Sequence, residues 1–394
     1  MTSLPAVLRD ATVAHGSDPR YGDRFDQVVR LAQAIFGVST VAVNLVDDVK
    51  QSTVAMVGLD GADMARDVAF CPHVVDSDQA MVVVDASVDD RFSDNPLVTG
   101  DPHIRFYAGE PLHGPSGQAL GALCIIDDRP RQITVDEQRM LRDLADWVEK
   151  ELQIDADSAQ AREVQRRLLP RRPLEVAGYE IAGQCRPARN VGGDYFDWMT
   201  LPDGTAQIAV ADVMGKGMEA AVVAAGVRSV VRGASRFGPL TESIGLVGQA
   251  MEEDFSDTGT FCTLFAARLT PSTGQLDYVD AGHGLAIIIP THGDVRRLTS
   301  RDLPLGAVSG DSWTLHHEQL APGDTLLVVS DGILDLFPDA GAALQAGVAL
   351  SADVRDARAM ADAITGVGGD TVHDDDITAV VVRREPAAHP RPAP

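Results

Sequence analysis

A chain of 394 residues is too long for one ordinary domain, and domains of about 100 to 200 residues make two the expected number. An apolar fraction of 45% excludes wholesale disorder, and a net charge of −25 disfavours nucleic acid and anionic membranes as partners. The cysteines lack paired spacing, and neither a secretory leader nor a membrane-crossing apolar run is found, so we expect reduced thiols and a cytoplasmic protein.

The first part of the chain is expected to be an α+β module. Residues 1–20 and the Pro/Ala-rich end, 386–394, have too little apolar content to pack and are expected to be disordered. Apolar residues from Phe25 to Ile35 recur at helical spacing until Gly37. The apolar runs that follow predict strands, at 38–46, 82–84 and 119–126.

A long helix is predicted next. Thr134 and Glu137 form a capping box, and Pro170 ends the helix about 35 residues later. The helix carries a narrow apolar stripe, made of Leu141, Leu144, Val148 and Leu152. The stripe is open to two interpretations: a seam that pairs with a second copy of the chain, or an ordinary helix packed on the first domain and followed by a charged tether.

From Pro173 onward the pattern becomes rich in strands. Consecutive strands joined by tight turns, as at Thr270–Gly274, favour antiparallel sheets with helices packed outside. The predicted strands are 179–185, 206–211, 263–269, 275–281, 286–290, 325–330 and 377–383, and the predicted helices are 217–237, 240–255 and 352–366.

Four aspartates in separate segments have settings suited to holding a metal ion. Asp212 and Asp331 each end an apolar strand, and glycines follow both. Asp194 and Asp375 lie in the short polar segments 190–197 and 374–378. Oxygen-only ligands select hard cations such as Mg²⁺ or Mn²⁺. A pair of such ions suits the hydrolysis of phosphate esters.

These segments resemble the bacterial SpoIIE/RsbU-type serine phosphatases, a branch of the metal-dependent PPM (PP2C-like) family. The resemblance rests on seven motifs in the family's order, which lie at 164–170, 191–197, 211–217, 280–283, 303–306, 330–332 and 375–378. It implies an α-β-β-α sandwich with two Mn²⁺ or Mg²⁺ ions at one edge. It also implies that a metal-activated water attacks phosphoserine or phosphothreonine without a phosphoenzyme.

The resemblance also assigns roles to single residues. It implies that Asp194, Asp212 and the Val213 carbonyl are metal ligands, together with Asp331 and Asp375 from the other end of the domain. The register of the last ligand stays open among Asp374, Asp375 and Asp376. Asp197 is expected to be structural or to lie outside the ligand shell.

Four further residues of this region bear on the site, and two of them have alternative roles. Arg189 is a candidate for holding the substrate phosphate, with a plain surface arginine as the alternative. His283 is either a proton donor near the site or a structural residue of a Gly-His-Gly turn. Asn190 and Asp280 depart from the family's usual acid and asparagine, but neither replaces a predicted ligand.

Residues 24–152 resemble a GAF sensory domain. The resemblance is carried by segments 66–73, 83–86, 90–96, 104–109 and 120–127. The pockets of such domains accept many ligands or none, and Glu110 stands here where a small apolar residue is common. Cys71 and His73 raise the possibility of a bilin or haem, which we do not favour because the same segment occurs in GAF domains without a chromophore.

The sequence thus predicts a GAF domain at 21–152, a helical linker at 153–172 and a phosphatase domain at 173–385. The expected substrate is a phosphoserine or phosphothreonine protein, with an anti-sigma factor antagonist of the STAS type as the specific hypothesis. A homodimer through the linker helix is expected. Two alternatives remain: a catalytically silent scaffold, and a metal-dependent nucleotide phosphohydrolase, for which Lys216 lacks the spacing of a phosphate-binding loop.

Overall fold

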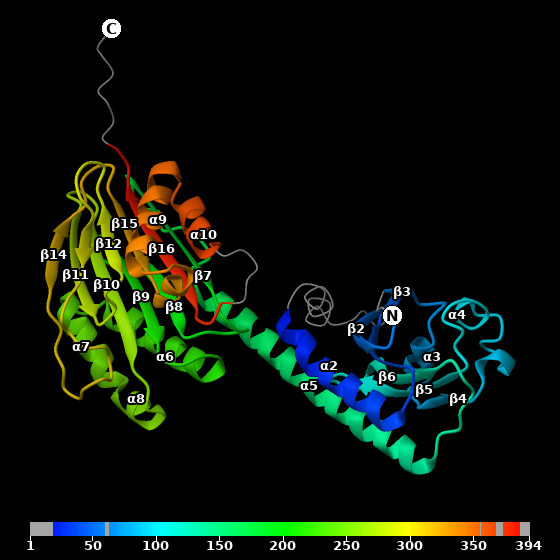
Figure 1. Cartoon of the computed structure of the whole chain (residues 1–394). Helices are drawn as coiled ribbons and strands as arrows, with labels where there is room; N and C mark the ends of the chain where they lie inside the picture. The colour runs from blue at the N-terminus through cyan, green and yellow to red at the C-terminus, as the bar shows by residue number, and fades with distance from the viewer. Residues whose placement is uncertain (1–18, 60–62, 355, 368–372, 387–394) are drawn as a thin grey trace, which may run out of the picture. The chain divides into compact units, whose positions relative to one another are not determined.

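The computed structural model describes residues 19–59, 63–354, 356–367 and 373–386. The predicted tails fall almost wholly outside these ranges, but Pro19 and Arg20 are helical rather than disordered. The chain divides into two compact units, residues 1–160 and 161–394, which are described separately (Figure 1). None of the described helices is long and apolar enough to cross a membrane.

The first unit is built around one antiparallel sheet with strand order β3-β2-β1-β6-β5-β4. Its elements are α2 (Pro19–Phe36), β1 (Thr40–Val46), β2 (Lys50–Val57), β3 (Met64–Ala65), α3 (Cys71–Ser77), β4 (Met81–Val83), η1 (Ala86–Val88), α4 (Pro96–Thr99), β5 (Phe106–His113), β6 (Ala119–Asp127) and α5 (Val135–Leu168). Side chains alternate along the strands, so each face of the sheet has its own apolar core. One core is shared with α2 and α5, and the other is shared with α3.

Helix α5 begins at the predicted capping box, because Thr134 N–H donates to Glu137 Oε2 at 2.7 Å and Glu137 N–H to Thr134 Oγ1 at 3.2 Å. The predicted dimer seam, however, is wrong. All of its residues are buried in the first unit's own core: Leu141, Leu144, Val148 and Leu152. The apolar periodicity correctly indicated that this face of α5 is buried, and the structure shows that α2 and the sheet bury it. The interpretation as a helix packed on its own domain is therefore confirmed for this stretch.

The Cys71 thiol lies in the apolar core next to α3 and has polar contacts there. It accepts hydrogen bonds from Tyr107 Oη at 3.3 Å and Asn44 Nδ2 at 3.4 Å, and it lies 3.8 Å from the Cys124 sulfur. Only 2% of Cys71 is exposed, so the thiol is part of the core on this face of the sheet.

Glu110, the departure from the usual small apolar residue, is also buried in the first unit. Its carboxylate lies 3.8 Å from Arg142 Nη1 of α5, and burial raises its pKa. The acid at this position therefore faces the long helix.

The second unit consists of two five-stranded antiparallel sheets with helices outside each (Figure 1). Their strand orders are β14-β11-β10-β9-β8 and β13-β12-β15-β16-β7. The strands are β7 (Tyr179–Arg186), β8 (Asp194–Thr200), β9 (Ala206–Val213), β10 (Cys262–Thr270), β11 (Gln275–Ala281), β12 (Ala286–Ile289), β13 (Arg296–Leu298), β14 (His316–Gln319), β15 (Thr325–Val329) and β16 (Ile377–Arg384). The helices are α6 (Met218–Ala234), α7 (Leu240–Ala250), α8 (Glu252–Thr258), η2 (Asp331–Leu336), α9 (Ala340–Asp353) and α10 (Ala357–Thr365).

Three apolar cores hold these layers together. The first lies between the two sheets, the second joins the first sheet to α6, α7 and α8, and the third joins the second sheet to η2, α9 and α10. The predicted α+β class and the α-β-β-α sandwich are therefore confirmed. The single helix expected at 240–255 is divided at Met251 into α7 and α8, and α9 was not predicted.

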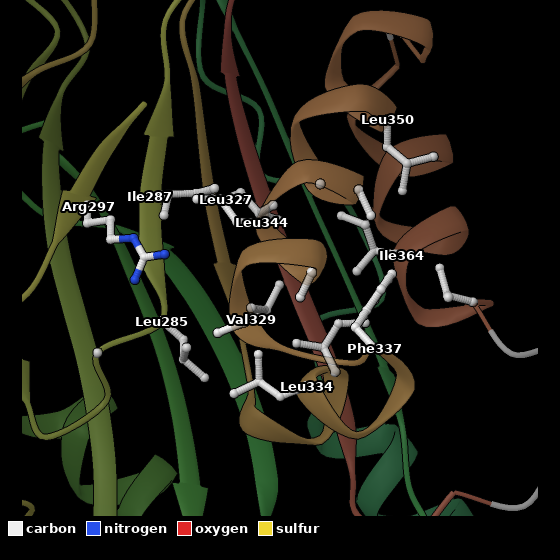
Figure 2. Close-up of a pocket in the computed structure, with 17 residues that line it drawn as sticks. Leu285, Ile287, Arg297, Leu327, Val329, Leu334, Phe337, Leu344, Leu350 and Ile364 are labelled. Carbon is white, nitrogen blue, oxygen red and sulfur yellow. The ribbon is translucent and has the colours of Figure 1, made fainter. Parts of the chain in front are cut away.

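A small apolar cavity of about 80 Å³ lies under α9, between this helix, η2 and the second sheet (Figure 2). Its cause is the composition of α9, whose inner surface includes Ala340, Ala343 and Gly347. Small side chains leave part of the space between helix and sheet unfilled. Ile333 and Leu334 of η2 form another wall, so this space lies behind the segment that carries Asp331.

Candidate metal centre

Asp194 and Asp212 lie directly opposite each other on neighbouring antiparallel strands. Asp194 begins β8, and the register of β8 with β9 pairs it with Asp212. Side chains at such positions point to the same face of the sheet, with Cβ atoms about 5 Å apart. Two of the predicted ligands are therefore held together by a strand pair.

The carboxylate of Asp194 is buried without a partner. The residue is 1% exposed, and neither of its oxygens makes a well-aligned hydrogen bond with a described residue, although the hydroxyls of Thr378 and Ser330 lie near enough to lower its pKa slightly. Burial raises its pKa well above the usual range, and the charges of Asp212 and Asp376 add to the rise. A buried carboxylate of this kind is costly unless a cation or a donor compensates it.

The other two predicted ligands lie beside the paired strands β15 and β16. Asp331 follows β15 at the first position of η2, and Asp375 precedes β16 by two residues. Ser330 connects the two segments, because its hydroxyl donates to the Asp376 carbonyl at 3.1 Å and accepts from Thr378 N–H at 2.8 Å. The Ser-Asp-Gly turn therefore fixes Asp331 relative to the 374–376 segment.

The two pairs meet at one end of the sandwich. The pKa of Asp212 is raised to about 7, first by burial and then by the charges of Asp331, Asp375 and Asp376. Among the residues that the structure describes, no three Asp, Glu, His or Cys side chains are grouped tightly enough to enclose an ion. The four predicted ligands thus form an open cluster of like charges. Their oxygen donors and the unpartnered Asp194 fit a hard divalent cation.

Asp375 and Asp376 have different environments, and this difference helps to decide which of them is the last metal ligand. Asp376 is 4% exposed, and its carboxylate accepts from the backbone amides of Ala188 at 2.8 Å and Asp194 at 3.4 Å. Asp375 is partly exposed, and its Oδ2 lies 3.3 Å from Lys216 Nζ. Asp376 therefore organises the loop before Asp194, which leaves Asp375 as the better candidate for a ligand.

Substitutions at these two positions should affect different properties of the protein. Asp375→Asn should weaken Mn²⁺ binding while leaving the thermal unfolding of the metal-free protein unchanged. Asp376→Ala should lower the free energy of unfolding by about 1 to 3 kcal/mol, because buried amides lose their acceptor. Melting curves with and without Mn²⁺ measure both effects. If Asp376→Ala keeps its stability but loses the Mn²⁺ response, the ligand is Asp376.

The glycines before Asp194 are required by close packing. A Cβ on Gly192 would lie 1.9 Å from Asp376 Oδ2, and one on Gly193 would lie 2.4 Å from the Val213 carbonyl oxygen. The Val213 carbonyl is therefore adjacent to the loop that carries Asp194, as its predicted ligand role requires. We name residues 188–194 the metal loop.

Gln165 is a residue of this region to which sequence reasoning gave no role. It lies in the last turns of α5, where its Nε2 donates to the Gly192 carbonyl at 2.6 Å and its Oε1 accepts from Gly192 N–H at 3.1 Å. Both ends of one side-chain amide thus hold one backbone residue of the metal loop. The motif at 164–170 contained this glutamine, but only the fold brings it to Gly192.

His283 and Asp197 have structural environments. Burial lowers the pKa of His283 to about 4, so its ring is neutral at physiological pH, which disfavours the role of a protonated acid. Asp280 accepts from the backbone amides of His283 and Gly284 and so holds the turn. Asp197 is buried against Arg228 and Arg232 of α6, as expected for a structural residue.

Arg189 lies on the metal loop with its side chain exposed. It makes no hydrogen bond or ion pair with any residue in the described part of the chain. Its neighbour Ala188 is fixed by Asp376, so the base of the arginine is held while its guanidinium is free to contact a ligand. Its assignment to the substrate phosphate stays a prediction.

Comparisons with known proteins find a matching family model within each unit. Residues 202–385 match the family model of stage II sporulation protein E (SpoIIE), and residues 21–152 match that of the GAF domain. Phosphoserine phosphatase RsbU of Bacillus subtilis is 24% identical over 206 residues, which cover 52% of this chain and 59% of the relative.

Two further similarities concern parts of the chain. A cyclic di-GMP phosphodiesterase of Pseudomonas aeruginosa is 38% identical over 107 residues, which cover 27% of this chain and 18% of the relative. The chain therefore spans less than two thirds of each of these relatives. Among solved structures, the SiaA-PP2C domain of P. aeruginosa aligns with 58% of this chain and 96% of its own, at 21% identity and a TM-score of 0.48.

Proposed function

We propose that this chain, in which a GAF domain precedes a SpoIIE-type domain, is a metal-dependent protein serine/threonine phosphatase. The observation that carries the proposal is the buried, unpartnered carboxylate of Asp194 opposite Asp212. Such a pair destabilises the fold unless a cation compensates it. The match to the SpoIIE model and the similarity to a phosphoserine phosphatase support the same activity.

In the proposed reaction, two Mn²⁺ or Mg²⁺ ions would be held by five groups: Asp194, Asp212, the Val213 carbonyl, Asp331 and Asp375. When bound, such ions lower the pKa of a water molecule and neutralise charge on a phosphoryl group. The chain itself contributes the rigid placement of these ligands. The β8–β9 pair holds one set of ligands, and the bonded segments around Ser330 hold the other. Arg189 would orient the phosphate through its forked guanidinium.

The alternatives receive less support. A silent scaffold does not need a buried carboxylate without a partner, and this favours an enzyme. A nucleotide phosphohydrolase would use the same ions, and the choice between it and a protein phosphatase rests on the relatives. The similarity to RsbU favours a phosphoserine protein, and we retain a STAS-type antagonist as the specific substrate hypothesis.

We retain a homodimer in the proposal, but on a different surface of α5. Met140, Trp147 and Ile154 are exposed and are spaced by seven residues, which is the repeat of a two-helix seam. The buried stripe of Leu144 and Val148 cannot serve this purpose, because the chain itself covers it. Regulation by a small-molecule ligand of the GAF domain completes the proposal.

Release of phosphate from a phosphoserine peptide tests the proposed activity. We expect turnover with Mn²⁺ or Mg²⁺ and its loss in excess EDTA, because the carboxylates alone cannot activate water. Restoration by added Mn²⁺ is the control for irreversible damage. Full activity in excess EDTA would reject the metal mechanism. Inactivity toward both the peptide and p-nitrophenyl phosphate with Mn²⁺ present would favour the scaffold.

A further inference from the structure

A recess lined by arginines lies beside the metal loop in the second unit. It has a volume of about 550 Å³ and is formed by the last turns of α5, the end of β7 and one side of α10. Its charged lining residues are four arginines and one acid: Arg162, Arg166, Arg186, Arg358 and Asp362. We name it the arginine recess.

The charge of this recess is opposite to that of the molecule. The chain carries 33 basic and 58 acidic residues, yet here basic residues outnumber acidic ones by four to one. Arg358 pairs with the acid of the recess, because its Nε donates to Asp362 Oδ2 at 3.2 Å. Arg162 makes no ion pair with a described residue, and Arg166 is 3.8 Å from Glu163 at an exposed position. The recess therefore keeps positive charge available to a ligand.

Two residues connect the recess to the candidate metal centre. Gln165 lines the recess and holds Gly192, two positions before Asp194. Cys185 lines it as well, and the register of β7 with β16 pairs it with Thr378, which closely follows the 374–376 segment. The chain also runs from Pro187, at the edge of the recess, to the exposed Arg189 within two residues. Positive side chains thus continue from the recess onto the metal loop.

We propose that the arginine recess binds an acidic segment of the protein substrate, next to the phosphoserine that enters the metal centre. This inference rests on the proposed function. Guanidinium groups pair with carboxylates in a bidentate way and are the residues suited to such a contact. An enzyme with a charge of −25 repels an acidic phosphoprotein at long range, so local positive charge beside the site gives the complex its orientation.

Two phosphoserine peptides of about 12 residues, which reach about 40 Å when extended, test this inference. One has aspartate and glutamate around the phosphoserine, and the other has glutamine and serine. We expect the wild-type protein to have a KM about tenfold lower for the acidic peptide, with a similar kcat for both. The preference should shrink at high salt, because exposed charges are screened.

The double variant Arg162→Glu/Arg166→Glu should abolish or reverse this preference while leaving the turnover of p-nitrophenyl phosphate within about twofold. Arg162→Gln/Arg166→Gln should give a smaller change in the same direction, and it keeps the test valid if the reversed charges impair folding. The matched control is Arg236→Glu/Arg297→Glu, because both arginines are exposed and neither lines the recess. This control makes the same change in net charge.

The outcomes separate the two proposals. An unchanged preference for the acidic peptide in both recess variants would overturn the docking role, even if both peptides are hydrolysed. An equal loss of preference in the control would also overturn it, because the effect would then come from overall charge. If the wild-type protein hydrolyses none of the three substrates, neither peptide and not p-nitrophenyl phosphate, the proposed function itself is rejected.

Discussion

Asp212→Asn is expected to lower the turnover of a phosphoserine substrate by at least about a hundredfold, without unfolding the protein. The substitution keeps the shape of the side chain and removes one charge from a cluster that also contains Asp194, Asp331 and Asp375. Because these charges repel each other, the metal-free variant should melt at the same temperature as the wild-type protein or higher. Initial rates and melting curves measure the two effects.

The response to Mn²⁺ provides a readout that does not depend on turnover. A ligand that binds only the folded state raises the melting temperature, so Mn²⁺ should stabilise the wild-type protein and stabilise Asp212→Asn much less. Asp257→Asn is the matched control, because Asp257 is an exposed residue of α8 and the charge change is the same. Wild-type turnover and a full Mn²⁺ response in Asp212→Asn would place the metal centre elsewhere.

Gly192→Ala is expected to have the second-largest effect. The added methyl group would lie 1.9 Å from Asp376 Oδ2, a distance that the structure cannot accommodate without moving the metal loop or the carboxylate. Overpacking of this kind costs about 1 to 3 kcal/mol. Moving the loop would also displace Asp194, so the variant should lose both stability and Mn²⁺ binding. Chemical denaturation and the Mn²⁺-dependent melting shift measure these losses.

A second glycine controls for the general effect of adding a methyl group. Gly245 lies within α7, and a Cβ there would meet nothing within 4 Å. Gly245→Ala should therefore raise the free energy of unfolding by up to about 1 kcal/mol, since alanine favours the helix. If Gly192→Ala behaves like Gly245→Ala, the metal loop has more freedom than the contact between Gly192 and Asp376 implies.

The candidate ligands could be predicted because their local settings are distinctive. Asp212 lies at the end of an apolar strand, and Asp331 directly follows one, each with glycines after it. The strand that carries Asp194 was harder to predict. Segment 194–200 begins with a charged residue and is buried at six consecutive positions, so it lacks the alternation that indicates a strand. The position of Asp194 opposite Asp212 depends on how the strands pair in the folded chain, which the local sequence pattern does not show.

Elsewhere the local pattern could not identify the surface that covers a segment. The stripe along α5 was read correctly as a covered face, but nothing in its spacing distinguishes a second copy of the chain from α2 and the sheet. Edge strand β14 is His-His-Glu-Gln, half exposed, and has no apolar signal. Helix α9 is rich in alanine and glycine, which weakens its apolar face. The contact of Gln165 with Gly192 joins residues 27 positions apart and depends on the whole fold.

The contact between Gln165 and Gly192 also determines where an independent catalytic fragment can begin. A fragment that starts at Pro202, where the SpoIIE match starts, would lack β7, β8 and Asp194. One that starts at Pro173 would contain all four carboxylates but no side chain to hold Gly192. Transfer of this catalytic unit to another sensor domain would therefore have to include the last turns of α5. The end of that helix belongs to the second unit and cannot be exchanged as a simple tether.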